Sequence, residues 1–303
     1  MKTMIKLTAG VAALALLAAC GGGGEPAQKS EAPAAAAGAS GGAVAGKPAL
    51  AVAAAGTPAP GQPVALTLTL TDANGKPLGP DAIATTHEHK VHVMIVDSAL
   101  EDYTHAHAEP GAAPGQWTVS FTPRFPRDYR VWTDFKLADG GHGDAHGESD
   151  GHAHDHSGEG AHDHGLTPSA VLAVGTEAGP PVAAAPALSV TADGYAFTLS
   201  IGGALTADAH VPATLTVADA SGAPVAALEP LMGAYAHLVG FSADGASMLH
   251  GHPEGAEPAS ADARGGPALT FDLHPAVAGP TRVFVQVKIG GKVITAPFTL
   301  VVG

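Results

Sequence analysis

Histidines at a repeated spacing are the residues of this chain best suited to chemistry. The segment His92–His107 is HVMIVDSALEDYTHAH, and the segment His237–His252 is HLVGFSADGASMLHGH. In both segments the second and third histidines follow the first at the same intervals, while most residues between them differ. Neutral imidazole nitrogens are ligands for Zn²⁺, Cu²⁺ and Ni²⁺. The repeated triplet therefore predicts a metal site.

The spacing of the second segment fits a β-hairpin. Asp244-Gly245 is a dipeptide suited to a two-residue turn. A turn centred there places His237 across from His252 and Val239 across from His250. Because side chains alternate between the faces of a strand, the three histidines then share one face. Directly opposed residues have Cβ atoms about 4.5–5.5 Å apart, close enough for two imidazoles to hold one ion.

The same register applied to the first segment pairs His92 with His107 and Met94 with His105, although Ala99-Leu100 is a poorer turn. A thioether beside the imidazoles favours copper. The predicted hairpin ligands are His92, Met94, His105, His107, His237, His250 and His252. The alternative is that these histidines cover a sheet surface or make structural hydrogen bonds, which a duplication would preserve equally well. The residues alone leave both interpretations open.

A second group of histidines lies between residues 142 and 164. Its members alternate with glycines, aspartates and glutamates: His142, His146, His152, His154, His156, His162 and His164. This composition cannot form a core and is typical of metal-collecting tracts. We expect a disordered loop with several weak, rapidly exchanging metal sites; the alternative is a solvated acidic loop without a ligand.

Cysteine and charge restrict the possible functions. Cys20 is the single cysteine, so neither a disulfide framework nor a thiolate metal site is expected. The chain has 14 Lys and Arg against 28 Asp and Glu, a net charge of −14, which argues against a nucleic-acid partner. We find no Ser/His/Asp arrangement, glycine-rich phosphate loop or paired carboxylates, and therefore predict that the protein is not an enzyme.

The N-terminus resembles a bacterial lipoprotein signal. A basic start and a short apolar run lead into Leu17-Ala18-Ala19-Cys20, the box that is cut before the cysteine. We expect a signal peptide over residues 1–19, a lipid on Cys20, and a flexible tether of Gly, Ala and Pro over residues 20–47. The protein would then be anchored in the cell envelope facing the periplasm. Gly21 favours the outer membrane over the inner one, by analogy with lipoprotein sorting.

The rest of the chain has the pattern of short β-strands. Alternating apolar residues followed by turn dipeptides, as in PVALTLTLTDANGKPL, recur in both halves. The sequence predicts an all-β protein of two tandem immunoglobulin-like or cupredoxin-like β-sandwiches, over residues 48–178 and 185–303. The histidine-rich segment is expected as an insertion, residues 139–165, in the last hairpin of the first sandwich.

Part of the second half resembles a family of exported bacterial β-sandwich domains. The segments GAYAHLVGFSADGASMLHGHPE and PTRVFVQVKIGGKVITAPFTLVV carry its His-Leu strand, His-x-His-Pro strand and closing hairpin. Members often accompany heavy-metal efflux and copper-resistance systems, so the resemblance implies copper as a metal and transport components as partners. Domain one departs from the pattern, because His107 is followed by Ala-Glu-Pro. The tract HAHDHSGEGAHDHG is similar in composition to histidine loops of periplasmic zinc-uptake proteins.

These observations predict a membrane-anchored periplasmic metal-binding protein, a buffer or chaperone for copper or zinc. The cofactor would be a divalent or monovalent transition metal, and the partners metal efflux or uptake components. The alternative is a structural or interaction protein of two β-sandwiches with no metal-dependent role.

Overall fold

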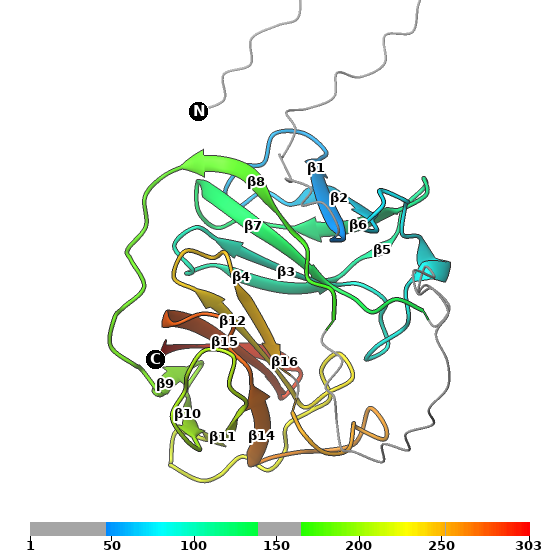
Figure 1. Cartoon of the computed structure of the whole chain (residues 1–303). Coiled ribbons are helices and arrows are strands. Elements are labelled where there is room, and N and C mark those ends of the chain that lie inside the picture. Colours follow the sequence, from blue (N-terminus) through cyan, green and yellow to red (C-terminus); the bar gives the residue numbers. More distant parts are fainter. Residues whose placement is uncertain (1–46, 139–164, 252) are drawn as a thin grey trace, which may run out of the picture. The chain divides into compact units, whose positions relative to one another are not determined.

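The computed structural model of the protein describes residues 47–138, 165–251 and 253–303 (Figure 1). Within these ranges the regular structure is β-strand, apart from one 3₁₀ turn at Pro80–Ala82. No helix in the described part of the chain is long and apolar enough to cross a membrane. The predicted all-β class is confirmed, and the strands group into two β-sandwiches (Figure 1).

The first sandwich consists of two four-stranded antiparallel sheets, with strand orders β1-β2-β6-β5 and β4-β3-β7-β8. Its strands are β1 (Ala49–Ala54), β2 (Val64–Thr71), β3 (His92–Asp97), β4 (Tyr103–His107), β5 (Glu109–Pro110), β6 (Gln116–Phe121), β7 (Arg127–Asp134) and β8 (Ser169–Thr176). Strand β2 shows why the alternating pattern folds this way: its leucines are buried and its threonines point outward.

The second sandwich repeats this plan with strand orders β14-β11-β10-β9 and β13-β12-β15-β16. Its strands are β9 (Ser189–Ala192), β10 (Tyr195–Ile201), β11 (Val211–Ala218), β12 (Ala236–Ser242), β13 (Met248–Gly251), β14 (Ala268–Leu273), β15 (Gly279–Ile289) and β16 (Lys292–Val302). The strands of the two sandwiches lie within the two halves predicted from the sequence.

Each sandwich has its own hydrophobic core between its two sheets. Trp117, Tyr129 and Phe135 are fully buried in the first, and Phe197 and Phe271 in the second. The apolar face of β3 lies in the first core, with Val93 and Ile95 fully buried. Because sheet side chains alternate, His92 of the same strand must point out of this core.

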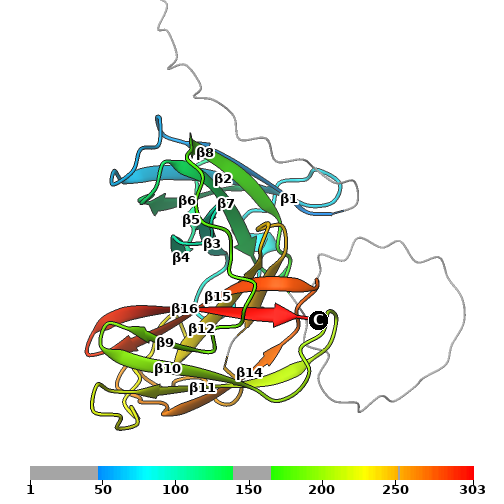
Figure 2. The same ribbon diagram turned by 90° about the vertical axis from the view of Figure 1, so that its left-hand side faces the viewer.

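A third apolar cluster buries that other face. Met94, Val96 and Leu100 of the first sandwich pack with Phe241 and Phe284 of the second. The described residues of both sandwiches belong to one compact unit, in which sheet β4-β3-β7-β8 faces sheet β13-β12-β15-β16 (Figure 2). The histidine faces of the two sandwiches are therefore turned towards each other.

Several residues singled out by the sequence lie outside the described part of the chain. They are Cys20 with the signal and tether residues 1–46, the seven histidines between residues 142 and 164, and His252. The segment that contains the seven histidines connects β7 to β8, the connection predicted to carry the insertion.

Candidate metal centre

The first hairpin has the register that the histidine spacing predicts. His92 pairs with His107 across β3 and β4, and Met94 pairs with His105. The ring centroids of His92 and His107 are 4.7 Å apart, and those of His105 and His107 are 5.6 Å apart. The three imidazoles thus gather on one face of the hairpin.

The second hairpin also follows its predicted register, with Val239 paired to His250. Its turn is centred on Asp244-Gly245, where Gly245 has a φ of 65° and the backbone N–H of Ser242 donates to the carbonyl of Ser247. The loop is longer than the predicted two residues, because the strand pair nearest the turn is Phe241 with Met248.

The sequence treats each hairpin as a separate site, but the structure brings the two histidine faces together around His105. Its ring centroid lies 5.7 Å from that of His92, 5.6 Å from His107, 4.9 Å from His237 and 5.6 Å from His250. One imidazole thus touches the histidines of both sandwiches. This arrangement depends on long-range packing of the two sandwiches, which no local pattern encodes.

The histidine nitrogens form two groups with ligand geometry. One consists of His92, His105 and His107, the other of His105, His237 and His250, and in each group the ligand atoms lie within 4.8 Å of one another. A tetrahedral ion with metal–nitrogen bonds of 2.0–2.1 Å needs nitrogens roughly 3.3 Å apart. Closing the groups around an ion therefore requires side-chain adjustments on the order of 1 Å.

Backbone carbonyls fix the orientation of the first histidine in each hairpin. The Nε2–H of His92 donates to the carbonyl oxygen of Thr86 at 3.1 Å, and the Nε2–H of His237 donates to that of Leu231 at 2.9 Å. A carbonyl can only accept, so in a neutral ring the lone pair is on Nδ1. Metal-binding histidines characteristically donate their other ring N–H in this way.

Two equivalent tight turns place these carbonyls. His87-Glu88 forms the first turn, with φ of 48° and 71°, and Met232-Gly233 forms the second, with φ of 50° and 78°. In each, the flanking residues exchange both backbone hydrogen bonds, Thr86 with His89 in the first. Two consecutive left-handed residues are the signature of a type I′ hairpin turn, so the chain reverses just before each metal-facing strand.

A carboxylate orients the third histidine of the second group. Nδ1 of His250 lies 2.6 Å from Oδ2 of Asp134, which belongs to β7 of the other sandwich. Burial alone raises the pKa of Asp134, but the hydrogen bond and charge of His250 hold it below its usual value. Asp134 is therefore ionised near neutral pH, and Nε2 of His250 is left as the nitrogen that can face an ion.

His105 has no such partner. Among the described residues, neither of its buried ring nitrogens has a hydrogen-bond partner, and the same is true of Nε2 of His107. Leaving a buried polar atom unsatisfied costs about 1–3 kcal/mol, so such atoms call for an explanation such as an ion or water. Because His105 lies between four other histidines, a bound cation is the explanation that fits these atoms best.

Burial keeps these imidazoles in the form that binds metal. It lowers the pKa of His92 to about 4 and that of His107 to about 3. Burial and the neighbouring histidines also lower the pKa of His237 to about 3 and that of His105 well below its usual range. Neutral imidazoles therefore prevail near pH 7, and no proton must leave them before a first ion binds.

Two further histidines lie beside the first group. The ring of His89 stacks on that of His107 with centroids 3.5 Å apart, and the ring of His87 lies edge-on to His92 at 6.4 Å. Nδ1 of His87 is 2.9 Å from a carboxylate oxygen of Glu257. On a continuous strand both histidines would point away from the site; the turn at His87-Glu88 explains why they do not.

Met94 lies in the apolar cluster between the sandwiches, fully buried and paired with His105 on one side and Trp132 on the other. Met94 is therefore the cross-strand neighbour of His105 in the sheet. By contrast, His210 and His274 stack on each other with centroids 4.2 Å apart, and His210 bonds to Asp272. These two belong to neither ligand group.

Sequence reasoning missed three parts of the site: the carboxylate of Asp134 and the carbonyls of Thr86 and Leu231. The repeat could have indicated the carbonyls, because Met232-Gly233 is a turn dipeptide at the position that His87-Glu88 occupies in the first half. No local signal marks Asp134, which follows an ordinary strand pattern.

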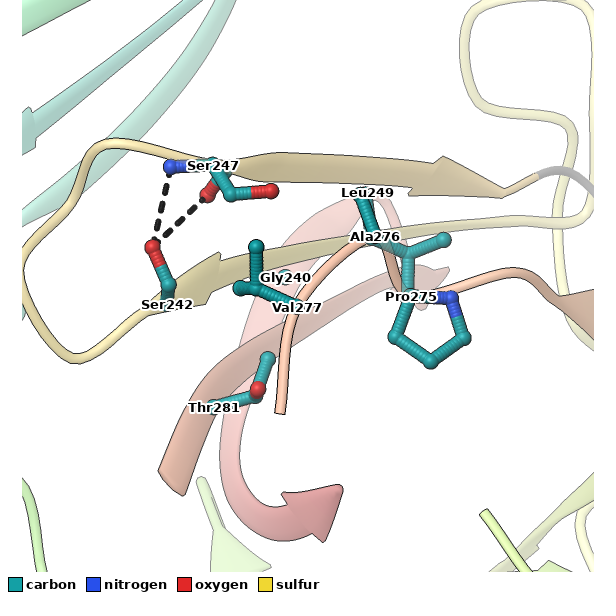
Figure 3. A pocket seen from close by; sticks show the side chains of 8 residues that line it. All are labelled: Gly240, Ser242, Ser247, Leu249, Pro275, Ala276, Val277 and Thr281. Atoms are coloured by element: carbon teal, nitrogen blue, oxygen red, sulfur yellow. Dashed lines mark hydrogen bonds between the residues drawn. The ribbon is translucent and has the colours of Figure 1, made fainter. Parts of the chain in front are cut away.

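A shallow hollow at the other face of the second hairpin is a weaker candidate for a functional site than the histidine cluster. It is lined by Gly240, Ser242, Ser247, Leu249, Pro275, Ala276, Val277 and Thr281 (Figure 3). The Ser242 hydroxyl, its central polar group, already accepts from the N–H of Ser247 and donates to Asp244. These hydrogen bonds close the hairpin end and explain the serines structurally.

A family model matches residues 45–145 and 190–303, and its description is "Domain of unknown function (DUF8832)". The chain belongs to this family. The matched ranges contain every described histidine of both ligand groups, and Asp134. A search of the curated proteins found no match.

Among solved structures, the chain is similar to invasin, described as a bacterial integrin-binding protein, with 15% sequence identity and a TM-score of 0.21. The alignment covers 82% of this chain and 38% of invasin, so the chain spans well under half of that protein. A score this low does not establish a common fold.

Proposed function

We propose that this DUF8832 protein is a metal-binding protein, a buffer or chaperone for copper or zinc, whose tight site is the histidine cluster between its two sandwiches. The observation that carries the proposal is His105, whose two buried ring nitrogens lack hydrogen-bond partners among the described residues while four other imidazoles surround it. A cation coordinated by these nitrogens would remove the energetic cost of leaving them buried without a partner.

The ligand set favours borderline metals. Imidazole nitrogens suit Zn²⁺ and Cu²⁺, and the position of Met94 beside His105 adds copper in either oxidation state as a candidate. Carboxylates that bind Mg²⁺ or Ca²⁺ directly are not part of either ligand group. We propose a binding role and not a catalytic one for this cluster, which lies beside the apolar residues that join the sandwiches.

We further propose that the seven histidines of residues 142–164 collect metal near the cluster, and that a lipid on Cys20 anchors the protein in the cell envelope facing the periplasm. The collecting segment begins eight residues after Asp134 in the sequence, and Asp134 is the carboxylate that contacts His250. Metal efflux or uptake components would then be partners that exchange ions with the cluster.

Calorimetric titration with Cu²⁺ and Zn²⁺ tests the proposal. The chain from residue 21 onward is compared with a variant whose seven histidines at 142–164 are replaced by Asn, and with that variant carrying His105→Asn as well. His274→Asn is the matched control, since His274 belongs to neither ligand group. We expect the loop variant to keep its tight site, His105→Asn to weaken it at least 100-fold, and His274→Asn to leave it unchanged.

The possible outcomes separate the claims. If the chain binds neither metal better than about 1 mM, the metal-binding function is wrong. If replacing the seven loop histidines abolishes all binding, the cluster is structural and the metal function belongs to the loop alone. The first result would favour the alternative function, a tandem sandwich in which these histidines only join two structural domains.

A further inference from the structure

We propose that the cluster holds two metal ions about 6 Å apart, bridged by the imidazole of His105. This inference rests on the proposed metal-binding function and specifies the site. His92 and His107 would complete the first ion's ligand set, and His237 and His250 the second's.

The grouping of the nitrogens is the first observation. The five histidines form two sets of three that share His105, and in each set the ligand atoms lie within 4.8 Å of one another. A single ion coordinated by all five would instead gather them into one set. One set lies on the first sandwich, and the other combines His105 with two histidines of the second sandwich.

The chemistry of His105 is the second observation. The two nitrogens of an imidazole point in diverging directions, so one ring cannot give both to the same ion. A single bound ion would leave the other nitrogen of His105 buried and, among the described residues, without a hydrogen-bond partner. A second ion satisfies it. With metal–nitrogen bonds near 2.0 Å, the two ions would be about 6 Å apart.

The surrounding hydrogen bonds support two separate ions. The N–H of His92 is directed at Thr86 and that of His237 at Leu231, which leaves Nδ1 as the ligand atom in both rings. The two sandwiches thus present equivalent, preoriented nitrogens, one for each ion. The internal sequence repeat thus duplicates the metal-binding nitrogen together with the strand that carries it.

Proton balance sets a measurable signature. Neutral His105 has one lone pair, which binds the first ion, and one N–H. Coordination of the second ion at that nitrogen displaces its proton to solvent, leaving a bridging imidazolate. Its negative charge lies between the two cations and reduces their repulsion, and the carboxylate of Asp134 adds a second negative charge through His250.

The test counts ions and detects the bridge. The full chain with its seven histidines at 142–164 replaced by Asn is titrated with Cu²⁺, followed by calorimetry in buffers of different ionisation enthalpy and by electron paramagnetic resonance. We expect two tightly bound equivalents, about one additional proton released with the second, and loss of the isolated Cu²⁺ signal as the second ion couples to the first. The variants His107→Asn and His237→Asn should each retain one ion with an ordinary, uncoupled signal.

Each result decides between the proposals. One tight equivalent in the parent chain, lost in both single variants, overturns the two-ion inference and leaves the metal-binding function intact. No tight equivalent overturns both. Two equivalents that stay magnetically independent, with no additional proton released, overturn the bridge. His105→Asn, checked for folding by circular dichroism, should reduce the affinity for both ions at least 100-fold and remove the coupling.

Discussion

Hairpins β3–β4 and β12–β13 share the parts that face the site and differ in the parts that support it. Both begin after a two-residue left-handed turn, and both direct Nε2 of their first histidine at a carbonyl before that turn. Behind the first hairpin, His92 pairs with Asp134; behind the second, His237 pairs with Gln286. The orientation of the first histidine is therefore the same in both hairpins, whereas the negative charge beside it, that of Asp134, is present only in the first.

The difference shows that the two halves have different tasks. Asp134 reaches His250 of the other sandwich, while Gln286 donates to Thr295 within its own sheet. Leu100 occupies the left-handed turn position that Gly245 occupies in the second half. The first half thus contributes the carboxylate and a buried anchor residue, and the second half contributes an unstrained turn.

The largest expected effect is the loss of stability of the metal-free protein in acid. The unfolded histidines titrate near pH 6.5, whereas burial lowers the folded pKa of His92 to about 4 and that of His237 to about 3. Below pH 6.5 the unfolded state binds more protons, so the free energy of unfolding falls by about 1.4 kcal/mol per pH unit for each such histidine.

Urea unfolding from pH 7.5 to pH 4.5 with a chelator present measures this slope. His92→Asn and His237→Asn should each flatten it by a similar amount, because both folded pKa values lie below this pH range. Bound metal should oppose the loss because it binds only the folded state. A stability that does not change between pH 6.5 and 5 would contradict the burial of neutral imidazoles.

The next effect compares the two hairpin turns. Leu100 is 2% exposed and packs in the cluster between the sandwiches. Its φ is 56°, a conformation that costs roughly 1–2 kcal/mol outside glycine and that its burial offsets. Leu100→Ala should lower the free energy of unfolding by about 2–5 kcal/mol, because it leaves a cavity without relieving the turn.

Gly245→Ala is the matched change in the second half. A Cβ there would meet no atom closer than 3.8 Å, so only the left-handed conformation opposes it. We expect a loss of about 1 kcal/mol. Chemical denaturation measures both variants, and equal losses would mean that Leu100 is not an anchor between the sandwiches.

The third effect tests the asymmetry of charge. Asp134→Asn removes the carboxylate that holds His250 and should weaken metal binding 10–100-fold, the usual effect of losing such a support. Gln286→Met changes the equivalent position without removing a charge and should alter affinity less than about threefold. Competition with a chromogenic chelator gives both affinities. If the two substitutions weaken metal binding equally, the charge of Asp134 does not distinguish the two hairpins.

The sequence predicted what is local and missed what is not. The spacing of His92, His105 and His107, which the second triplet repeats, predicted the hairpin register, because a strand's period of two leaves few alternatives. The meeting of His105 with His237 could not be predicted, since it depends on how two complete sandwiches pack. Asp134 was missed for the same reason: its partner is in the other half.

The smallest effect concerns the tight turns that precede the metal-facing strands, where the two halves should respond in opposite directions. Gly233 has a φ of 78°, and a Cβ there would lie 3.0 Å from both Cα and Cβ of His87 in the opposing turn. Gly233→Ala should therefore cost about 1–2 kcal/mol of stability. At the equivalent position Glu88 has a φ of 71°, so Glu88→Gly should relieve strain and stabilise by up to about 1 kcal/mol. Denaturation curves at pH 7.5 measure both. If both variants shift stability in the same direction, the left-handed conformation is not what limits these turns, and the carbonyls of Thr86 and Leu231 are held by something else.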